Sequence, residues 1–430
     1  MKEFDKIPVT KVQRATRFLK TGARIGGNYL KHYGKRLINP DTSKDELHQD
    51  NAADIYQSLS ELKGSALKVA QMLSMDRNIL PQAYQQKFAL AQYSAPPLSY
   101  PLVVKIFQKS FGKKPDDIFD SFTRNAVNAA SMGQVHQATL GKKKLAVKVQ
   151  YPGIGDSVQS DLAMVKPFAQ AMFKINPADY REFIQEVEQR LLEETDYDLE
   201  LKRSVDLTRK CKHLNNVRFP EYYSKLSGSK VLTMDWLDGI PLGEFLKHPF
   251  TPEAGQKIGQ ALWDFYDFQM HELRQVHADP HPGNFIITPQ QELGVIDFGC
   301  VKVIPDGFYK QFFRMLDRTM LSRPEELHEV FLAMRFLHED DSPAEKKFFT
   351  ALFTELVELL SRPFGGDSFD FSDKAYFQTL YAYGERLSSM KEIRESKKAR
   401  GVKDALYINR TYFGIYSLLH ELKATVSIQK

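Results

Sequence analysis

Residues 277–285 read HADPHPGNF, and residues 294–299 read GVIDFG. Asp279 and Asn284 stand five residues apart, and Asp297 follows thirteen residues after Asn284, at the end of a short apolar run. Carboxylate and carboxamide oxygens are hard ligands of the kind that Mg²⁺ prefers, and Mg²⁺ commonly leaves its other positions to phosphate and water. These two segments therefore predict a site for metal-bound phosphate groups.

The same spacing is typical of protein-kinase-like enzymes, in which the first aspartate orients or deprotonates the acceptor. In those enzymes the asparagine and the aspartate of the Asp-Phe-Gly triplet hold Mg²⁺ on the nucleotide phosphates. A bare Asp-Phe-Gly triplet also occurs in ordinary turns, but the two segments in this order are much more specific. We expect Asp279 to be the catalytic aspartate, and Asn284 and Asp297 to be metal ligands.

A strand-like run, LAVKVQ, places Lys148 where kinases carry the lysine that contacts the α- and β-phosphates. A carboxylate on a downstream helix usually fixes that ammonium group. Glu200 is our choice of partner and completes the expected catalytic set. Glu188, Glu193 and Glu194 lie on the same helical stretch, and spacing alone does not separate them from Glu200.

No glycine-rich Gly-x-Gly-x-x-Gly segment precedes this lysine. The chain reads NAASMGQVH from Asn128, so Ala129, Ala130 and Ser131 stand where kinases have glycines. Backbone amides can still approach phosphate there, but alanine restricts the positive-φ conformations that glycine permits. We expect these three residues to contact a nucleotide in a way that differs from ordinary protein kinases.

Hydrophobic periodicity divides the chain into three parts. Residues 1–120 show helical spacing, residues 121–237 contain strand-length runs such as VLTMDWL, and residues 238–430 are again dominated by helices. Met234 and Trp236 in VLTMDWL match the kinase hinge, whose backbone holds adenine. The expected fold class is α+β: a two-lobed protein-kinase-like fold with a small strand-rich N-lobe, a large helical C-lobe and an N-terminal helical extension.

Composition argues against several classes of protein. The chain of 430 residues is 42% hydrophobic and 26% charged with a mean hydropathy of −0.41, which is typical of a folded soluble protein. Two cysteines cannot build a disulfide framework or a four-thiolate metal site. A net charge of +5, without a recognisable binding motif, gives no support for a nucleic-acid partner. With neither a signal segment nor a membrane span in evidence, we expect a cytoplasmic protein with peripheral membrane contact.

Charge is most asymmetric at the N-terminus, where residues 1–40 hold ten basic and two acidic side chains. Apolar residues among them approximate a helical stripe, which is typical of an interfacial helix on an anionic membrane. The alternative is a basic helix that docks on its own domain. The sequence leaves both interpretations open.

These segments together resemble the UbiB (AarF/ADCK) family of atypical kinases over nearly the whole chain, from about Ile7. The resemblance rests on KGSALKVAQMLS, NAASMGQVH, VKVQYPG, ETDY, LTMDWLDG, HADPHPGNF, VIDFG and RTYFGIYSLLHEL. It implies that Lys68 and Gln71 belong to the family's Lys-x-Gly-Gln motif. It also implies that Glu194 and Asp196 form its Glu-x-Asp motif, and that the two motifs meet where a protein substrate would otherwise enter.

The resemblance further implies a site for ATP or ADP with Mg²⁺, autoinhibition or selection of a small or lipid-like substrate, and a link to isoprenoid-quinone synthesis or membrane-lipid homeostasis. Two departures from the family pattern bear on the preference between ATP and ADP: Ala70 replaces the motif glycine, and Asn128 replaces the first alanine of the alanine-rich loop. Two alternatives stay open: a kinase for a soluble small molecule, and a nucleotide-gated binding module without turnover.

Overall fold

The computed structural model describes residues 11–38, 45–62, 97–130, 132–173, 177–394, 398 and 400–428. Lys68, Gln71 and Ser131, to which the sequence assigns site roles, lie outside these residues. The chain divides into two compact units, the first made of Met1–Lys202 and Glu221–Trp236 and the second of Arg203–Pro220 and Leu237–Lys430. The division into an extension and two lobes at residues 120 and 237 stays a prediction.

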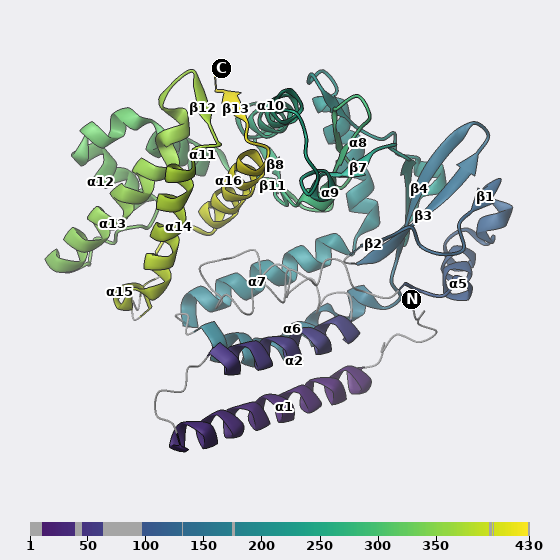
Figure 1. Ribbon diagram of the computed structural model, residues 1–430, viewed down its shortest axis with the longest axis horizontal. Coiled ribbons are helices and arrows are strands. Elements are labelled where there is room, and N and C mark those ends of the chain that lie inside the picture. Colours follow the sequence, from purple (N-terminus) through teal and green to yellow (C-terminus); the bar gives the residue numbers. More distant parts are fainter. Residues whose placement is uncertain are drawn as a thin grey trace. The chain divides into compact units, whose positions relative to one another are not determined.

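The first unit contains a five-stranded antiparallel sheet of order β1-β3-β4-β6, in which β2 pairs with β3 (Figure 1). The strands are β1 (Ser121–Phe122), β2 (Asn128–Ala130), β3 (Gly133–Leu140), β4 (Lys143–Gln150) and β6 (Val231–Asp235). The helices among its described residues are α1 (Lys11–Ile38), α2 (Asp45–Leu62), α5 (Tyr100–Phe111), α6 (Ile154–Phe173), α7 (Pro177–Glu194) and the start of α8 (Tyr197–Cys211).

Packing of α5 on the sheet decides which way the side chains of β4 face. Helix α5 ends at Gly112, whose φ of 68° is left-handed and suits glycine at a helix end. Phe107 of α5 is fully buried in one core cluster with Val147 and Val149 of β4. Because alternate residues of a strand face opposite sides of the sheet, Lys148 faces away from this core.

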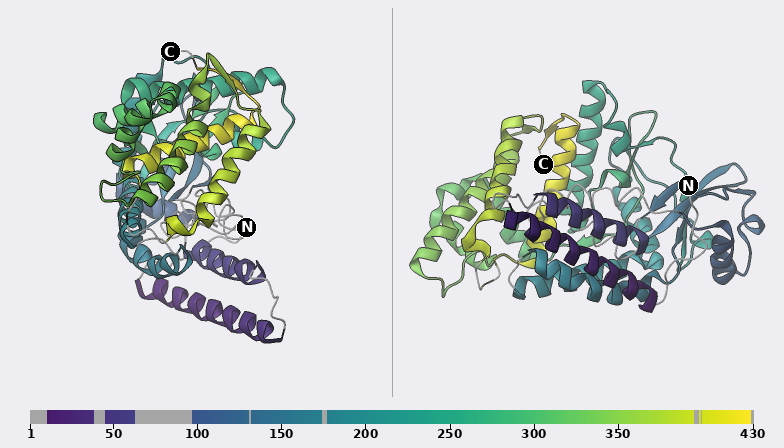
Figure 2. Two further views of the ribbon diagram at one scale, coloured as in Figure 1. Left: turned by 90° about the vertical axis from the view of Figure 1, so that its left-hand side faces the viewer. Right: turned by 60° about the horizontal axis from the view of Figure 1, so that its bottom comes forward.

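Helices α1 and α2 lie side by side within the first unit (Figures 1 and 2). The amide of Asn28 in α1 donates hydrogen bonds to Asn51 at 3.1 Å and to Asp54 at 2.8 Å, both in α2. His32, one turn further along α1, is buried. One face of the basic N-terminal helix therefore docks on its own unit.

The second unit holds a sheet of order β5-β10-β9-β7 and the pairs β8–β11 and β12–β13. Its strands are β5 (Val217–Arg218), β7 (Ile240–Pro241), β8 (Gln275–His277), β9 (Phe285–Ile287), β10 (Leu293–Val295), β11 (Val301–Val303), β12 (Ser368–Asp370) and β13 (Thr425–Ser427). The described helices are α9 (Leu242–Phe245), α10 (Pro252–Phe268), α11 (Asp306–Leu316), α12 (Pro324–Ala333), α13 (Pro343–Ser361), α14 (Lys374–Ser389), α15 (Lys391–Arg394) and α16 (Lys403–Glu421).

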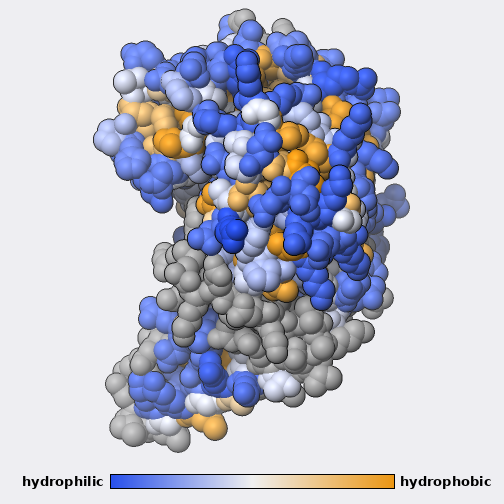
Figure 3. All heavy atoms as spheres, turned by 90° about the vertical axis from the view of Figure 1, so that its right-hand side faces the viewer, coloured by the Kyte–Doolittle hydropathy of each residue, from blue (hydrophilic) through white to orange (hydrophobic). Residues whose placement is uncertain are grey.

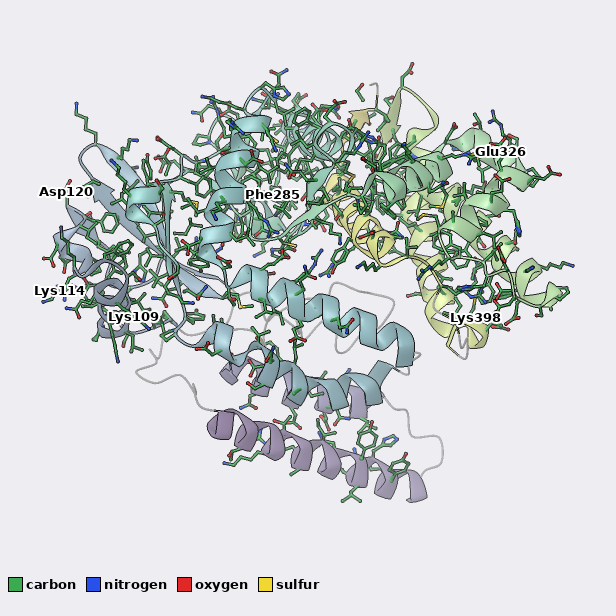
Figure 4. All side chains as sticks on the ribbon, turned by 180° about the vertical axis from the view of Figure 1, so that it is seen from behind. Lys109, Lys114, Asp120, Phe285, Glu326 and Lys398 are labelled. Atoms are coloured by element: carbon green, nitrogen blue, oxygen red, sulfur yellow. The ribbon has the colours of Figure 1, made fainter. Side chains whose placement is uncertain are left out.

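Aromatic packing fixes the strands that flank the two decisive sequence segments. Phe285 of β9 is fully buried in the interior of the second unit (Figure 4). Its ring meets the His277 ring of β8 edge-on, with centroids 6.2 Å apart. Phe298 of the Asp-Phe-Gly triplet lies against the same histidine at 5.9 Å. The loop after β8 and the triplet after β10 therefore share one apolar support.

The face of the molecule shown in Figure 3 is largely hydrophilic, with small and separate hydrophobic areas. Among the residues that the structure describes, Leu30 of α1 and Val303 of β11 are the most exposed large apolar side chains, at 77% and 66%. Among the described residues, we find no helix with the length and apolar character needed to cross a membrane.

Candidate functional site

Lys148 and Glu200 form a buried ion pair in the first unit. The ammonium Nζ of Lys148 on β4 donates a hydrogen bond to Oε1 of Glu200 on α8 at 2.7 Å. The two side chains are only 11% and 2% exposed. The ring of Tyr197, one turn before Glu200, lies 5.2 Å from the same ammonium, within reach of a cation–π interaction. Of the glutamates that spacing left open, the structure places Glu200 beside Lys148.

Asp196 fixes the first turn of the helix that carries Glu200. Its Oδ1 accepts a hydrogen bond from the Leu199 N–H, and its carbonyl accepts one from the Glu200 N–H, both at 2.9 Å. A carboxylate at this position satisfies a helix N–H group and opposes the positive end of the helix dipole. Glu194 is the last residue of α7, so the Glu-x-Asp motif spans the junction between α7 and α8.

A second tie joins the same strand to the junction between α7 and α8. The Gln150 side chain, 1% exposed at the end of β4, donates to the carbonyl of Thr195 at 2.8 Å. Lys230 donates in turn to Oε1 of Gln150 at 2.5 Å. Our reading of the sequence missed Gln150 and Thr195. The available signal was a glutamine at a buried position of an apolar strand, because a buried amide requires partners.

The alanine-rich segment is a strand. Ala129 and Ala130 belong to β2, and neither has a positive φ. An extended backbone accepts alanine without strain, so the absence of glycine is explained locally. Gly133 is the position that needs glycine, because a Cβ there would lie 2.5 Å from the Val149 carbonyl oxygen and 2.8 Å from the Tyr197 hydroxyl.

Met234 and Trp236 lie where the chain leaves the first unit. Met234 is 5% exposed on β6, opposite Ala146 of β4. The Trp236 N–H donates to the Lys144 carbonyl at 2.9 Å. The boundary between the two units falls directly after Trp236. Contact of these residues with adenine stays a prediction.

One carbonyl group organises the loop of residues 278–284, which joins β8 to β9 in the second unit. The Asp279 carbonyl accepts hydrogen bonds from the His281 N–H at 2.7 Å and from the Asn284 side-chain amide at 2.9 Å. The Ala278 N–H donates to the Cys300 carbonyl at 2.9 Å, which links the start of the loop to the residue after the Asp-Phe-Gly triplet. The structure therefore brings Asp279 and Asn284 together.

Asp297 lies close to the same loop. The Ile296 N–H donates to the Asn284 carbonyl at 3.1 Å, and Oδ1 of Asp297 accepts from the Gly299 N–H at 2.8 Å. The side-chain nitrogen of Asn284 donates to the Asp279 carbonyl, so the side-chain oxygen of Asn284 points in another direction. A carboxamide oxygen and a carboxylate are hard donors that suit Mg²⁺. Across the described ranges, no three His, Cys, Asp or Glu side chains gather into a metal-binding group.

Buried polar groups of α10 and the turn after it hold His277, the residue just before this loop. Tyr266 of α10 is hydrogen-bonded to Nδ1 of His277 at 2.9 Å. Burial raises the pKa of Tyr266 well above its ordinary value, and the negative charge of Asp279 raises it further, so the phenol stays neutral. The backbone N–H of His277 donates to Oε1 of Gln269 at 2.9 Å. Gln269 begins a π-helical turn after α10, and such turns often occur at functional sites.

The family model described as the ABC1 atypical kinase-like domain matches residues 90–330, which is more than half of the chain. The chain belongs to the ABC1 family. This confirms the resemblance to the UbiB (AarF/ADCK) atypical kinases and, with the mixed helices and strands described above, the kinase-like α+β fold.

Two curated relatives illustrate the similarity of this ABC1-family chain. An ABC1 family protein from Schizosaccharomyces pombe is 28% identical over 315 residues, covering 70% of this chain and 57% of the relative. A chloroplastic aarF domain-containing protein kinase from Arabidopsis thaliana is 28% identical over 349 residues, covering 79% of this chain and 48% of the relative. The chain thus spans about half the length of these relatives.

A solved structure is also similar. The complex of Rv3197 with erythromycin from Mycobacterium tuberculosis matches with a TM-score of 0.59 and 27% sequence identity, over 90% of this chain and 97% of that chain. Together with the relatives named as kinases, this places the ABC1-family chain among kinase-like proteins.

Proposed function

We propose that this chain binds Mg-ATP or Mg-ADP and catalyses ATP hydrolysis or phosphoryl transfer to a small or lipid-like acceptor. The Lys148–Glu200 ion pair carries the proposal. Its Nζ and Oε1 atoms are 2.7 Å apart, and both side chains are almost completely buried. A buried ion pair is often no more stabilising than apolar residues of similar size. Its presence therefore favours a function, and directing an ammonium group to nucleotide phosphates is one that kinase-like proteins need.

The loop of the second unit supplies the remaining proposed roles. The Asp279 carboxylate would orient the acceptor and receive its proton, held in place by the hydrogen bonds at its own carbonyl. Asn284 and Asp297 would hold Mg²⁺ through oxygen atoms. When bound, the metal would neutralise charge on the phosphates. In the first unit, Lys148, held by Glu200, would contact nucleotide phosphates.

The class of acceptor is proposed from the family resemblance. It points to isoprenoid-quinone or membrane-lipid metabolism, and Lys68 and Gln71, together with Glu194 and Asp196, would restrict entry to small or lipid-like acceptors. Of these four residues, Asp196 caps α8 through its hydrogen bond from the Leu199 N–H.

We further propose that α1 contacts an anionic membrane surface. Helix α1 contains eight Lys and Arg residues and no Asp or Glu. Leu30, Tyr33 and Tyr29 are 77%, 54% and 42% exposed, and the two tyrosine rings stack at 6.4 Å. Exposed apolar side chains on a basic helix are typical of interfacial membrane binding. The buried face of α1 docks on α2, so the two interpretations of the sequence concern different faces of one helix.

Thermal unfolding with Mg-ATP and with Mg-ADP tests the nucleotide site. A ligand at a hundred times its dissociation constant stabilises a protein by about 2.7 kcal/mol. We expect a clear rise in Tm for the wild type and a much smaller rise for Asp297→Asn. No rise in the wild type at millimolar nucleotide would contradict the proposal.

Measurement of ATP turnover separates the functional alternatives. Stimulation by anionic vesicles supports a lipid-linked ATPase or kinase, and stimulation only by a soluble acceptor supports a small-molecule kinase. Nucleotide binding without turnover under either condition identifies a binding module.

A further inference from the structure

A glycine in the long C-terminal helix touches the loop that carries Asp279. Gly414 lies within α16, and a Cβ added to it would lie 2.3 Å from Cγ and 3.2 Å from Cβ of Pro280. Carbon atoms of two side chains do not approach so closely, so a side chain at 414 would displace one of the two segments. Glycine inside a helix is less favourable than alanine, and the close approach of Pro280 explains why it stands here.

Helix α16 is held firmly at both ends. Near its start, Asp404 forms an ion pair with Lys302 of β11 at 3.0 Å. Just after its end, the Leu422 carbonyl oxygen comes so near α10 that a Cβ at Gly255 would lie 2.4 Å from it. Helix α10 leads through a π-helical turn into β8 and the loop. Because these contacts tie both ends of α16 to neighbouring elements, we expect a displacement forced at Gly414 to fall mainly on the loop.

Pro280 transmits such a displacement directly to the proposed catalytic groups. Its ring is rigid and is bonded to the carbonyl of Asp279. That carbonyl accepts the hydrogen bonds from the His281 N–H and the Asn284 amide. A shift of the ring therefore turns the peptide unit on which Asp279 and Asn284 both depend.

We propose that Gly414 is a positioning residue, whose missing side chain leaves the notch that seats Pro280 and thereby sets the positions of Asp279 and Asn284. This inference rests on the proposed function for its catalytic consequence. Its structural content, the dependence of the loop on Gly414, stands by itself.

The test compares Gly414→Ala with Gly27→Ala, a glycine inside α1 where an added Cβ meets nothing within 4 Å. Since misplacing a reacting group by about 1 Å can cost about a hundredfold in rate, we expect kcat of Gly414→Ala to fall by about tenfold or more. The KM for ATP should rise and the Tm shift with Mg-nucleotide should shrink as well, because Asn284 is a proposed metal ligand and is bonded to the same carbonyl. Gly27→Ala should leave all three unchanged.

A double-mutant cycle with Pro280→Ala isolates the contact. Pro280→Ala removes the Cγ at 2.3 Å and leaves the Cβ at 3.2 Å, so adding Gly414→Ala in this background should lower kcat far less than it does in the wild type, because only contacting residues couple in this way. The double variant also keeps the test open if Gly414→Ala alone fails to fold. An effect of Gly414→Ala that is equally large in both backgrounds would overturn the inference.

Hydrogen exchange separates this inference from the proposed function. The amides of His281 and Asn284 donate within the loop, and both should exchange faster in Gly414→Ala but not in Gly27→Ala. If the wild type shows no turnover and these amides still respond, the proposed function fails and the positioning role stands. If the amides exchange at wild-type rates in Gly414→Ala, the positioning role is overturned, whatever the turnover.

Discussion

The carbonyl of Thr195 accepts a hydrogen bond from the Gln150 side chain at 2.8 Å. Gln150 lies two residues after Lys148 on β4, and Thr195 lies five residues before Glu200 of α8. The Lys148–Glu200 ion pair is therefore not the only link between this strand and this helix. One tie reaches the first turn of α8 and the other reaches the residues just before it, so together they hold this part of the chain against β4. Glu200 is thereby kept beside Lys148 before any nucleotide binds.

Removing one member of the ion pair should be costly. Glu200→Gln removes the negative charge that lies 2.7 Å from the Lys148 ammonium, and removing one partner of a buried pair typically lowers the free energy of unfolding by about 3–5 kcal/mol. The double variant Lys148→Met/Glu200→Met should lose less stability than either single variant, because both charges of the pair are removed together. Urea denaturation followed by Trp236 fluorescence in a Trp263→Phe background reports on the first unit. Single variants within about 0.5 kcal/mol of wild type would rule out a buried pair.

Loss of the α8 cap should weaken the site from a distance. Asp196→Ala leaves the Leu199 N–H without its partner and should lower stability by about 1 kcal/mol. Because Glu200 lies in the same turn, the rise in Tm with Mg-nucleotide should shrink as well. Asp196→Asn keeps a capping oxygen and should stay near wild type in both measurements. Asp198→Ala removes an exposed carboxylate from the same turn and serves as the matched control. An equal effect of both alanine variants would assign the role to charge rather than to capping.

A buried histidine should make the first unit sensitive to mild acid. His136, fully buried on β3, is hydrogen-bonded through Nδ1 to the Thr123 carbonyl at 2.7 Å and through Nε2 to Gln134 at 2.8 Å. Oε1 of Gln134 accepts the Leu98 N–H at 2.6 Å. A carbonyl only accepts, so Nδ1 of His136 carries the proton and Nε2 receives the amide hydrogen. Protonation of Nε2 would break the hydrogen bond that it accepts from Gln134.

The sign of the pH effect follows from the pKa. Burial lowers the pKa of His136, although the hydrogen bond to Thr123 raises it, so the folded state binds this proton less readily than the unfolded state. The stability from neutral His136 is therefore complete above a pH of about 6.5 and is lost as the pH falls below that value. We expect Tm to fall more between pH 7.5 and pH 5.5 in the wild type than in His136→Asn, whose amide can still donate to Thr123. Parallel curves for the two proteins would contradict this assignment.

Membrane contact through α1 should depend on its exposed leucine. Burying a leucine side chain contributes about 1.5–3 kcal/mol, so Leu30→Ser should weaken binding to phosphatidylglycerol vesicles by about tenfold or more. Binding to neutral phosphatidylcholine vesicles should be weak, and added salt should reduce the anionic binding. Leu140→Ser changes a leucine that is 38% exposed at the end of β3 and should bind like wild type. Equal binding by wild type and both variants would place any membrane contact elsewhere.

The sequence by itself determined the family and the fold class. HADPHPGNF with GVIDFG, and the alternation around Lys148, are short patterns in which the residue types and their local spacing already express the chemistry. Such patterns predict strands, loops and metal-type ligands because those features depend on neighbours along the chain. Local periodicity also predicted the basic helix that is observed as α1.

Only the tertiary structure decided which distant residues meet. Four glutamates share the helical stretch before and within α8, and the packing of that helix on β4 brings Glu200 to Lys148. The tie from Gln150 to Thr195 and the notch at Gly414 likewise join segments far apart in sequence. The periodicity of a helix or strand predicts which residues share one face of that element. It does not predict which other element that face will contact, because contacts between elements depend on close packing of the whole core.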